Sequence, residues 1–113
     1  MSLANTKWNL NDGSGTTSTV SFGPNQAPAG QNAGGNGLKT THYSPPTGDL
    51  SVEILWIEDG KGNYMYQTKG PTDPGNKELP TSTGSYHNNS AIGWGSNFDA
   101  AWGTWGESMI KQP

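Results

Sequence analysis

Three of the five tryptophans in this 113-residue chain lie within twelve residues of one another. Each has a glycine neighbour, so little adjacent in the sequence covers the rings. An indole ring is a large, flat, apolar surface that carries one N–H donor. Short polar residues stand beside the rings, and this combination suits the faces and hydroxyl groups of a sugar ring. The candidate ligand-binding residues of this stretch are Trp94, Asn97, Asp99, Trp102, Thr104 and Trp105.

A second polar run directly precedes this stretch and adds Tyr86, His87 and Asn88 to the candidate ligand-binding residues. Such a run at the start of a strand could line a polar site, although a surface turn is the commoner outcome for residues of these types. The tryptophans also have a structural interpretation, because tryptophan is highly buried on average. Trp102 and Trp105 are three residues apart, so in one continuous strand they point to opposite faces, and at least one of them is expected in the core.

Other kinds of chemistry find little support. There is no cysteine, which removes disulfides, thiolate catalysis and cysteine-type zinc sites. The two histidines, His42 and His87, lack metal-ligand spacing. Glycoside hydrolysis needs two carboxylates at a defined separation, and nothing in the sequence pairs Glu53 or Glu58 with another acid. No nucleotide-binding or nucleophile motif occurs. We therefore expect no enzymatic activity, no cofactor and no metal site.

The charge pattern restricts the partners. The formal net charge is −3, all six cations are lysines, and they are scattered along the chain. Nucleic-acid binding normally uses a basic stripe that contains arginine, so we expect no nucleic-acid partner. No apolar run approaches the length of a membrane span, and the first residues contain no signal peptide. The sequence predicts a soluble protein without membrane insertion, either cytoplasmic or exported by a non-classical route.

The composition and periodicity predict an all-β fold. Seventeen glycines and eight prolines leave little room for helices, and no window has a helical apolar pattern. Alternating side chains predict a small antiparallel β-sandwich or β-barrel of about six to eight short strands. The strands that can be placed are residues 6–11, 16–22, 38–43, 49–58, 63–68, 90–98 and 102–110. In the fourth of these, Leu55 and Ile57 add a second apolar face, which predicts a central strand buried on both sides or a strand at a subunit interface. Asp59-Gly60 predicts a hairpin with a type I′ turn.

We expect one domain over residues 1–113, in which residues 24–37 form a mobile loop rich in glycine, asparagine and proline. Only 29% of the residues are hydrophobic, which makes an isolated monomer marginal and favours a homo-oligomer. The repeated pairs Trp94-Gly95 and Trp105-Gly106 are eleven residues apart, a spacing that suits a hairpin but that can arise by chance in a glycine-rich chain.

Together these features predict a lectin-like protein whose partners are glycans and whose shallow, exposed site combines tryptophan rings with short polar side chains. The composition is similar to that of small cysteine-free microbial and fungal lectins as a general class. Oligomers of such proteins gain avidity from several weak sites. Two alternatives remain open. One is a β-barrel that holds a small apolar ligand in its interior. The other is a structural or adhesive module whose interface is the stretch 54–57.

Overall fold

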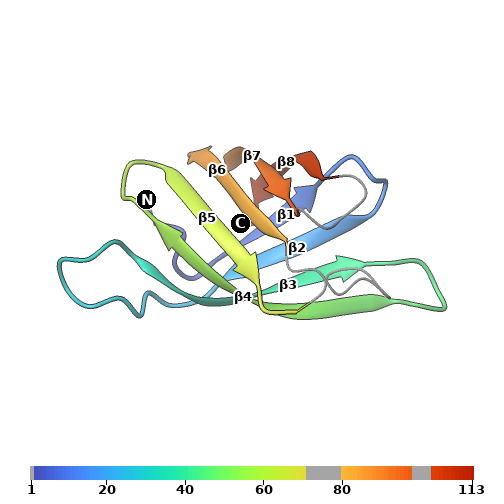
Figure 1. Ribbon diagram of the computed structural model, residues 1–113, viewed down its shortest axis with the longest axis horizontal. Helices are drawn as coiled ribbons and strands as arrows, with labels where there is room; N and C mark the ends of the chain where they lie inside the picture. Colours follow the sequence, from blue (N-terminus) through green and yellow to red (C-terminus); the bar gives the residue numbers. More distant parts are fainter. Residues whose placement is uncertain (1, 71–79, 98–102) are drawn as a thin grey trace.

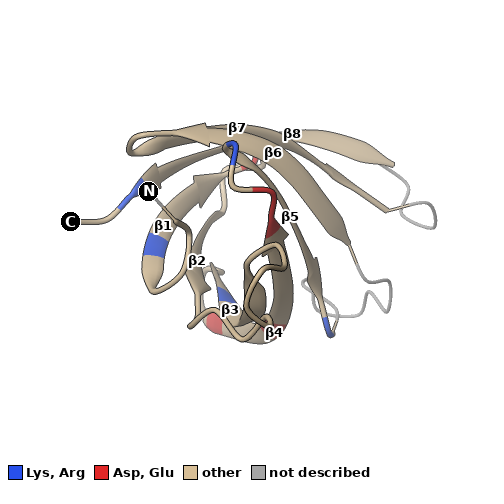
Figure 2. Ribbon diagram, turned by 90° about the vertical axis from the view of Figure 1, so that its left-hand side faces the viewer, with Lys and Arg blue, Asp and Glu red and all other residues tan. Residues whose placement is uncertain are grey.

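The computed structural model describes residues 2–70, 80–97 and 103–113. Eight strands succeed one another along the chain: β1 (Thr6–Asn11), β2 (Thr17–Phe22), β3 (Gly34–His42), β4 (Asp49–Glu58), β5 (Asn63–Thr68), β6 (Thr81–His87), β7 (Ser90–Ser96) and β8 (Thr104–Lys111). Each strand pairs antiparallel with the next, and β8 pairs with β1 to close a barrel. Figure 1 shows the strands in chain order, and Figure 2 shows them arranged around a ring. The all-β prediction is confirmed, and the architecture is the barrel.

Side chains alternate between the inside and the outside of this single-layered barrel. Along β5, Tyr64, Tyr66 and Thr68 are buried, while the residues between them are exposed. An eight-stranded barrel has an interior that side chains can just fill. The buried apolar residues that fill it are Leu3, Trp8, Leu10, Val20, Phe22, Ile54, Trp56, Tyr64, Tyr66, Ala91 and Met109.

Aromatic rings make up much of this core. Phe22 packs edge-on against Trp56 and Tyr66, with ring centroids 5.8 and 6.0 Å apart. Tyr64 stacks on Tyr66 with 5° between the ring planes. Aromatic pairs in these geometries add stability beyond the area that they bury. A chain with few aliphatic residues therefore fills its core with rings.

One end of the barrel is closed by the beginning of the described chain. The side chain of Leu3 is fully buried, and its backbone N–H donates to Oε2 of Glu58 over 2.7 Å. Glu58 is itself 96% buried in the last position of β4, and its Oε1 accepts a hydrogen bond from the hydroxyl of Tyr86. The segment before β1 thus seals this end with an apolar side chain and a buried polar network.

The predicted bounds of the strands agree best with the structure where apolar and polar residues alternate strongly. β1, β4 and β5 have the predicted bounds, and β2, β7 and β8 differ by one or two residues. β3 begins at Gly34 instead of residue 38, because a glycine-rich segment can approach its neighbours closely. A Cβ atom at Gly37 would lie 2.2 Å from the carbonyl oxygen of Ser21. β6 was not predicted, because its inward positions Ser82 and Gly84 are small and carry no apolar signal.

The prediction that β4 is a central strand, buried on both sides within the chain, is wrong, and the alternative of a strand at a subunit interface stays a prediction. Leu55 and Ile57 are 50% and 43% exposed, because the outer surface of a one-layered barrel has no second layer packed on it. The hairpin between β4 and β5 is confirmed, but its turn is not type I′. Positive φ angles occur at Gly60 and Gly62, and Asp59 instead accepts hydrogen bonds from the backbone N–H groups of Lys61 and Asn63.

The bounds of the long loop also change. Residues 34–37 belong to β3, so the connection between β2 and β3 is shorter than the predicted stretch 24–37. Within this connection, the N–H of Gln26 donates to the carbonyl of Gly34 over 2.8 Å. Oδ1 of Asn25 accepts hydrogen bonds from the N–H groups of Ala27 and Gly34. These contacts attach the loop to the start of β3, and its mobility stays a prediction.

Candidate functional site

The β7–β8 hairpin places two tryptophans on opposite faces of the barrel wall. Its register pairs Trp94 with Gly106 and Gly95 with Trp105. The Trp94 ring projects outward with 66% of its surface exposed, and it reaches over Gly106. The Trp105 ring covers Gly95, where a Cβ atom would lie 2.1 Å from Cε2 of the ring. The two Trp-Gly dipeptides are therefore cross-strand partners, in which each ring occupies space left by the opposite glycine.

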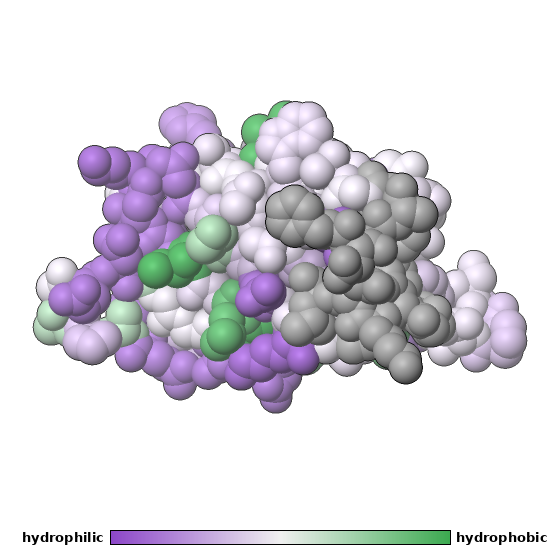
Figure 3. Space-filling model, in the orientation of Figure 1, coloured by the Kyte–Doolittle hydropathy of each residue, from purple (hydrophilic) through white to green (hydrophobic). Residues whose placement is uncertain are grey.

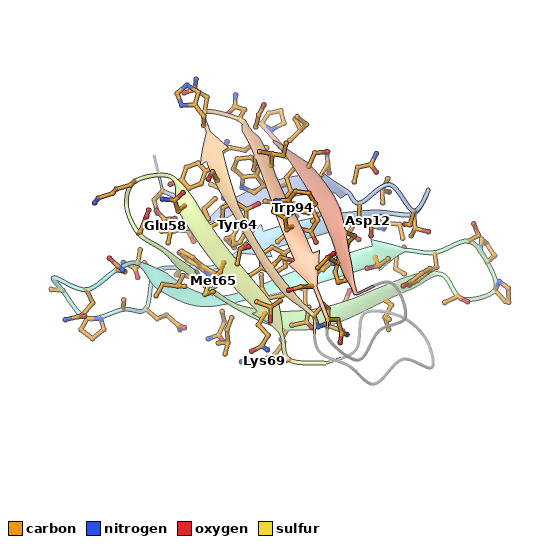
Figure 4. All side chains as sticks on the ribbon, turned by 45° about the horizontal axis from the view of Figure 1, so that its top comes forward. Asp12, Glu58, Tyr64, Met65, Lys69 and Trp94 are labelled. Atoms are coloured by element: carbon orange, nitrogen blue, oxygen red, sulfur yellow. The ribbon has the colours of Figure 1, made fainter. Side chains whose placement is uncertain are left out.

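A groove runs along the outer surface beside Trp94. Its lining comes from β5, β6, β7 and β8 and from the end of β1 with the turn that follows. In Figure 4, Trp94 and Asp12 lie on opposite sides of β8. The volume of about 1030 Å³ is at the upper end of the range for small-molecule sites. We call this feature the outer groove.

Two rows of outward side chains form the walls of the outer groove. The first row is set by direct pairing of neighbouring strands and contains Asn63, Ser85, Ile92, Ser108 and Asn11. The second row contains the side chains of Thr83 and Trp94, which are direct partners, and continues to Gly106, which has no side chain and is paired with Trp94. Between them lies a row whose side chains are absent or point into the barrel, namely Tyr64, Gly84, Gly93 and Glu107. The floor of the groove is therefore mainly backbone.

The exposed apolar side chains of the outer groove lie on β7. There the groove passes over Gly93 between Ile92, which is 73% exposed, and Trp94. The neighbouring strands contribute the short polar side chains of Thr83, Ser85 and Ser108. The arrangement offers an apolar ring next to hydroxyl and amide groups on a surface that is open to solvent.

Behind the floor, a buried carboxylate holds the inner side of the wall together. Glu107 is 4% exposed and accepts three hydrogen bonds from neutral donors. The donors are the hydroxyl of Tyr66 at 3.2 Å, Oγ of Ser82 at 3.0 Å and Nε1 of Trp105 at 2.9 Å. These bonds connect β5, β6 and β8 and fix the inner tryptophan. Glu107 forms no ion pair with any of the described residues.

Burial and nearby glutamates raise the pKa values of three tyrosines. Desolvation is the largest cause for each of them. It raises the pKa of Tyr86 to about 12, with the adjacent Glu58 as the next cause. The pKa values of Tyr64 and Tyr66 lie well above the ordinary tyrosine value, with Glu107 adding to the effect of burial. All three hydroxyls are thus stabilised in the neutral form.

This shift predicts alkaline unfolding. The folded pKa exceeds the unfolded value of about 10, so the unfolded chain loses the tyrosine protons first. The stabilisation is complete below about pH 10 and, for Tyr86, is lost as the pH rises towards about 12. Urea unfolding measured from pH 8 to 11.5 should show a midpoint that falls only above about pH 10. In Tyr66→Phe the urea midpoint should fall less between pH 10 and pH 11.5. If the midpoint falls equally in this variant, ionisation of the buried tyrosines is not the cause of the alkaline unfolding.

The structure does not bring the residues predicted from the sequence into one site. Trp94 lies in the outer groove, whereas Trp105 is half-buried inside the barrel and Asn97 is buried. Thr104 is exposed at the start of β8, outside the groove lining. Asp99 and Trp102 lie outside the described residues.

The second predicted run is also divided. Tyr86 is directed to Glu58 inside the barrel, while His87 and Asn88 are exposed where β6 turns into β7. Asn88 has a φ of 54°, which fits its place in this tight turn. None of these three residues lines the outer groove.

Sequence reasoning missed most of the groove. Asn11, Asp12 and Asn63 were assigned to strand ends and turns, and Thr83 and Ser85 belong to the strand that was not predicted. One usable signal was the pairing of the two Trp-Gly dipeptides. It fixes the β7–β8 register and so places Gly106 and Ser108 beside Trp94 and Ile92.

Neither the donor groups of the chain nor its comparison with known proteins indicates a function. In the described part of the chain, no group of three or more histidines, cysteines or carboxylates is arranged to hold a metal ion. No helix within the same residues is long and apolar enough to cross a membrane. The chain matches no protein-family model, no curated protein and no solved structure.

Proposed function

We propose that this protein binds carbohydrate without catalysis, through the outer groove. The observation that supports this most strongly is Trp94, a large apolar ring that is 66% exposed beside a groove with polar walls. Exposing an indole to water forgoes the stabilisation that its burial would bring. A binding role accounts for that exposure.

The chemistry of the groove suits a sugar ring. The C–H groups on one face of a pyranose can pack on the indole, while hydroxyl groups around the ring donate and accept hydrogen bonds. Thr83, Ser85 and Ser108 offer both donor and acceptor capacity, and the amide of Asn11 adds more. An open, solvated groove is consistent with modest affinity for each site.

The alternative of an apolar ligand inside the barrel gains no support from the packing. The interior holds eleven buried apolar residues in contact, and Leu3 closes one end. The remaining buried side chains of the interior include polar groups such as Ser82 and Glu107. We therefore place the ligand on the outer surface.

We also propose that the protein forms a homo-oligomer, with the outer face of β4 and β5 as the contact. Leu55, Ile57 and Met65 are 50%, 43% and 44% exposed, and Ile57 pairs directly with Met65. Figure 3 shows hydrophobic groups on the face that carries these strands. An uncharged apolar patch is complementary to itself, as a two-fold contact requires. This contact would also relieve the thin core and place several grooves on one particle.

A glycan array probed with the purified full chain tests the proposal, and the same sample is sized in solution. We expect selective binding to a set of neutral glycans and a mass that is a multiple of the chain mass. An array without signal from a folded protein would remove the carbohydrate proposal. A monomer that still binds would remove only the oligomer proposal and leave the groove in place.

A further inference from the structure

The outer groove crosses the strands instead of running along them. Its first wall advances by one strand at each step, from Ser85 on β6 through Ile92 and Ser108 to Asn11 on β1. Neighbouring strands are about 4.8 Å apart, so three steps cover about 14 Å and the extension to Asn63 on β5 brings the length to about 19 Å. A pyranose ring is about as long as one such step. The groove therefore has room for a chain of rings in single file.

The two walls of the groove stand close together on each strand. They are outward positions two residues apart, as Ile92 and Trp94 are on β7. At about 3.4 Å per residue their Cα atoms are about 7 Å apart, so a sugar ring lies over these side chains and not between them. The floor presents backbone, because Gly84 and Gly93 have no side chains and Glu107 points inward. A straight chain of rings can follow this row across the strands, and a strongly curled one cannot.

The charge of the lining selects against anions. Among the described residues that line the groove, the carboxylates are Asp12, at the β1 end, and the buried Glu107, and none is a lysine. Phosphate, sulfate or carboxylate groups would find no cation there and would be repelled at the Asp12 end. The polar groups that remain are neutral hydroxyls and amides.

We infer that the outer groove takes an uncharged, β-linked, linear oligosaccharide of about four rings, lying across β6, β7, β8 and β1. This inference rests on the carbohydrate-binding function proposed above. Diequatorial β-linkages keep a chain extended, and all-equatorial rings present the C–H faces that can pack on Trp94. The ring at β7 lies over the exposed side chains of Ile92 and Trp94, and the rings on either side contact Ser85 and Ser108.

The test is titration of the full chain with β-1,4-linked glucose and N-acetylglucosamine oligomers of two to six rings. We expect affinity for at least one series to rise about tenfold from two rings to four and to stay level beyond. Ser85→Tyr places a bulky ring in the β6 part of the groove and should remove this gain from two rings to four. Because tyrosine is well tolerated at exposed strand positions, this variant is expected to fold.

Ser51→Tyr is the matched control, since Ser51 is also an exposed strand serine that bonds a neighbouring side chain, but on β4 outside the groove. It should keep the full length dependence. An α-1,4-linked tetramer of glucose, which curls, should bind at least tenfold more weakly than the β-linked tetramer. Equal affinity for two and four rings, or an unchanged gain in Ser85→Tyr, would overturn the inference while leaving carbohydrate binding intact. If no saccharide binds in these titrations or on the glycan array, the proposed carbohydrate-binding function itself is wrong.

Discussion

Replacement of Trp94 by alanine is expected to abolish glycan binding and to leave the fold intact. The ring is 66% exposed, so its removal takes little from the core, and the free energy of unfolding should change by about 0.5 kcal/mol or less. Binding should weaken at least about 100-fold, which corresponds to about 2.7 kcal/mol. A loss of this size is typical of an aromatic residue at the centre of a contact surface. Calorimetric titration and urea unfolding on the same variant measure the two effects separately.

Two control variants make this result interpretable. Trp8→Ala removes a fully buried ring and should lower the free energy of unfolding by about 3–5 kcal/mol. His87→Ala removes an exposed residue that the sequence placed in the site and the structure places outside the groove, so its binding should equal that of the unmodified chain. If Trp94→Ala binds normally, or if His87→Ala is the variant that loses binding, the outer groove is the wrong site.

Replacement of Glu107 by alanine is expected to cost more stability than any change on the outer surface. The carboxylate is 96% buried and accepts hydrogen bonds from Tyr66, Ser82 and Trp105. Without it, three donors lose their acceptor, and each buried donor left unsatisfied costs about 1–3 kcal/mol. We expect a total loss of at least about 3 kcal/mol in the free energy of unfolding, measured in urea. The near-ultraviolet circular dichroism of the folded fraction should also change, because Trp105 loses the bond that orients it.

Glu53→Ala is the matched control for this prediction. Its side chain is 68% exposed and meets Lys69 at 3.4 Å on the outer surface. Exposed pairs of this kind contribute at most about 1 kcal/mol. Glu107→Gln keeps one carbonyl oxygen in place and should lie between the two variants. A loss in Glu107→Ala no larger than in Glu53→Ala would show that the three bonds do not stabilise the barrel.

The parts of the fold that were predictable are those with strong alternation of apolar and polar residues. In β4, Ile54 and Trp56 mark one face so clearly that both ends of the strand were placed correctly. β6 was missed because two of its inward positions are filled by Ser82 and Gly84, whose small size makes room for larger rings on neighbouring strands. Tyr64 is one of these, since a Cβ atom at Gly84 would lie 2.7 Å from its hydroxyl oxygen. Such a strand is specified by its partners and has no pattern of its own.

The candidate site was predictable in chemistry more than in position. The tryptophan-rich stretch pointed to a surface that combines rings with short polar groups, and Trp94 is such a ring. The other members of the groove include residues more than eighty positions away, and only the register brings Asn11 beside Ser108. Proximity along the chain was the wrong guide to proximity in space, because in a barrel neighbours along the groove belong to different strands.

Closure of the barrel through β1 and β8 has a consequence for how the chain is made. β1 is the first strand to emerge from the ribosome and β8 is the last, yet Trp8 to Asn11 pair directly with Lys111 to Ser108. Until β8 has emerged, a nascent chain carries two open sheet edges, one on β1 and one on β7. Open edges pair readily with other chains. The barrel can therefore close only after β8 has been made, and a chain that stops short of residue 104 retains both edges as sites of aggregation.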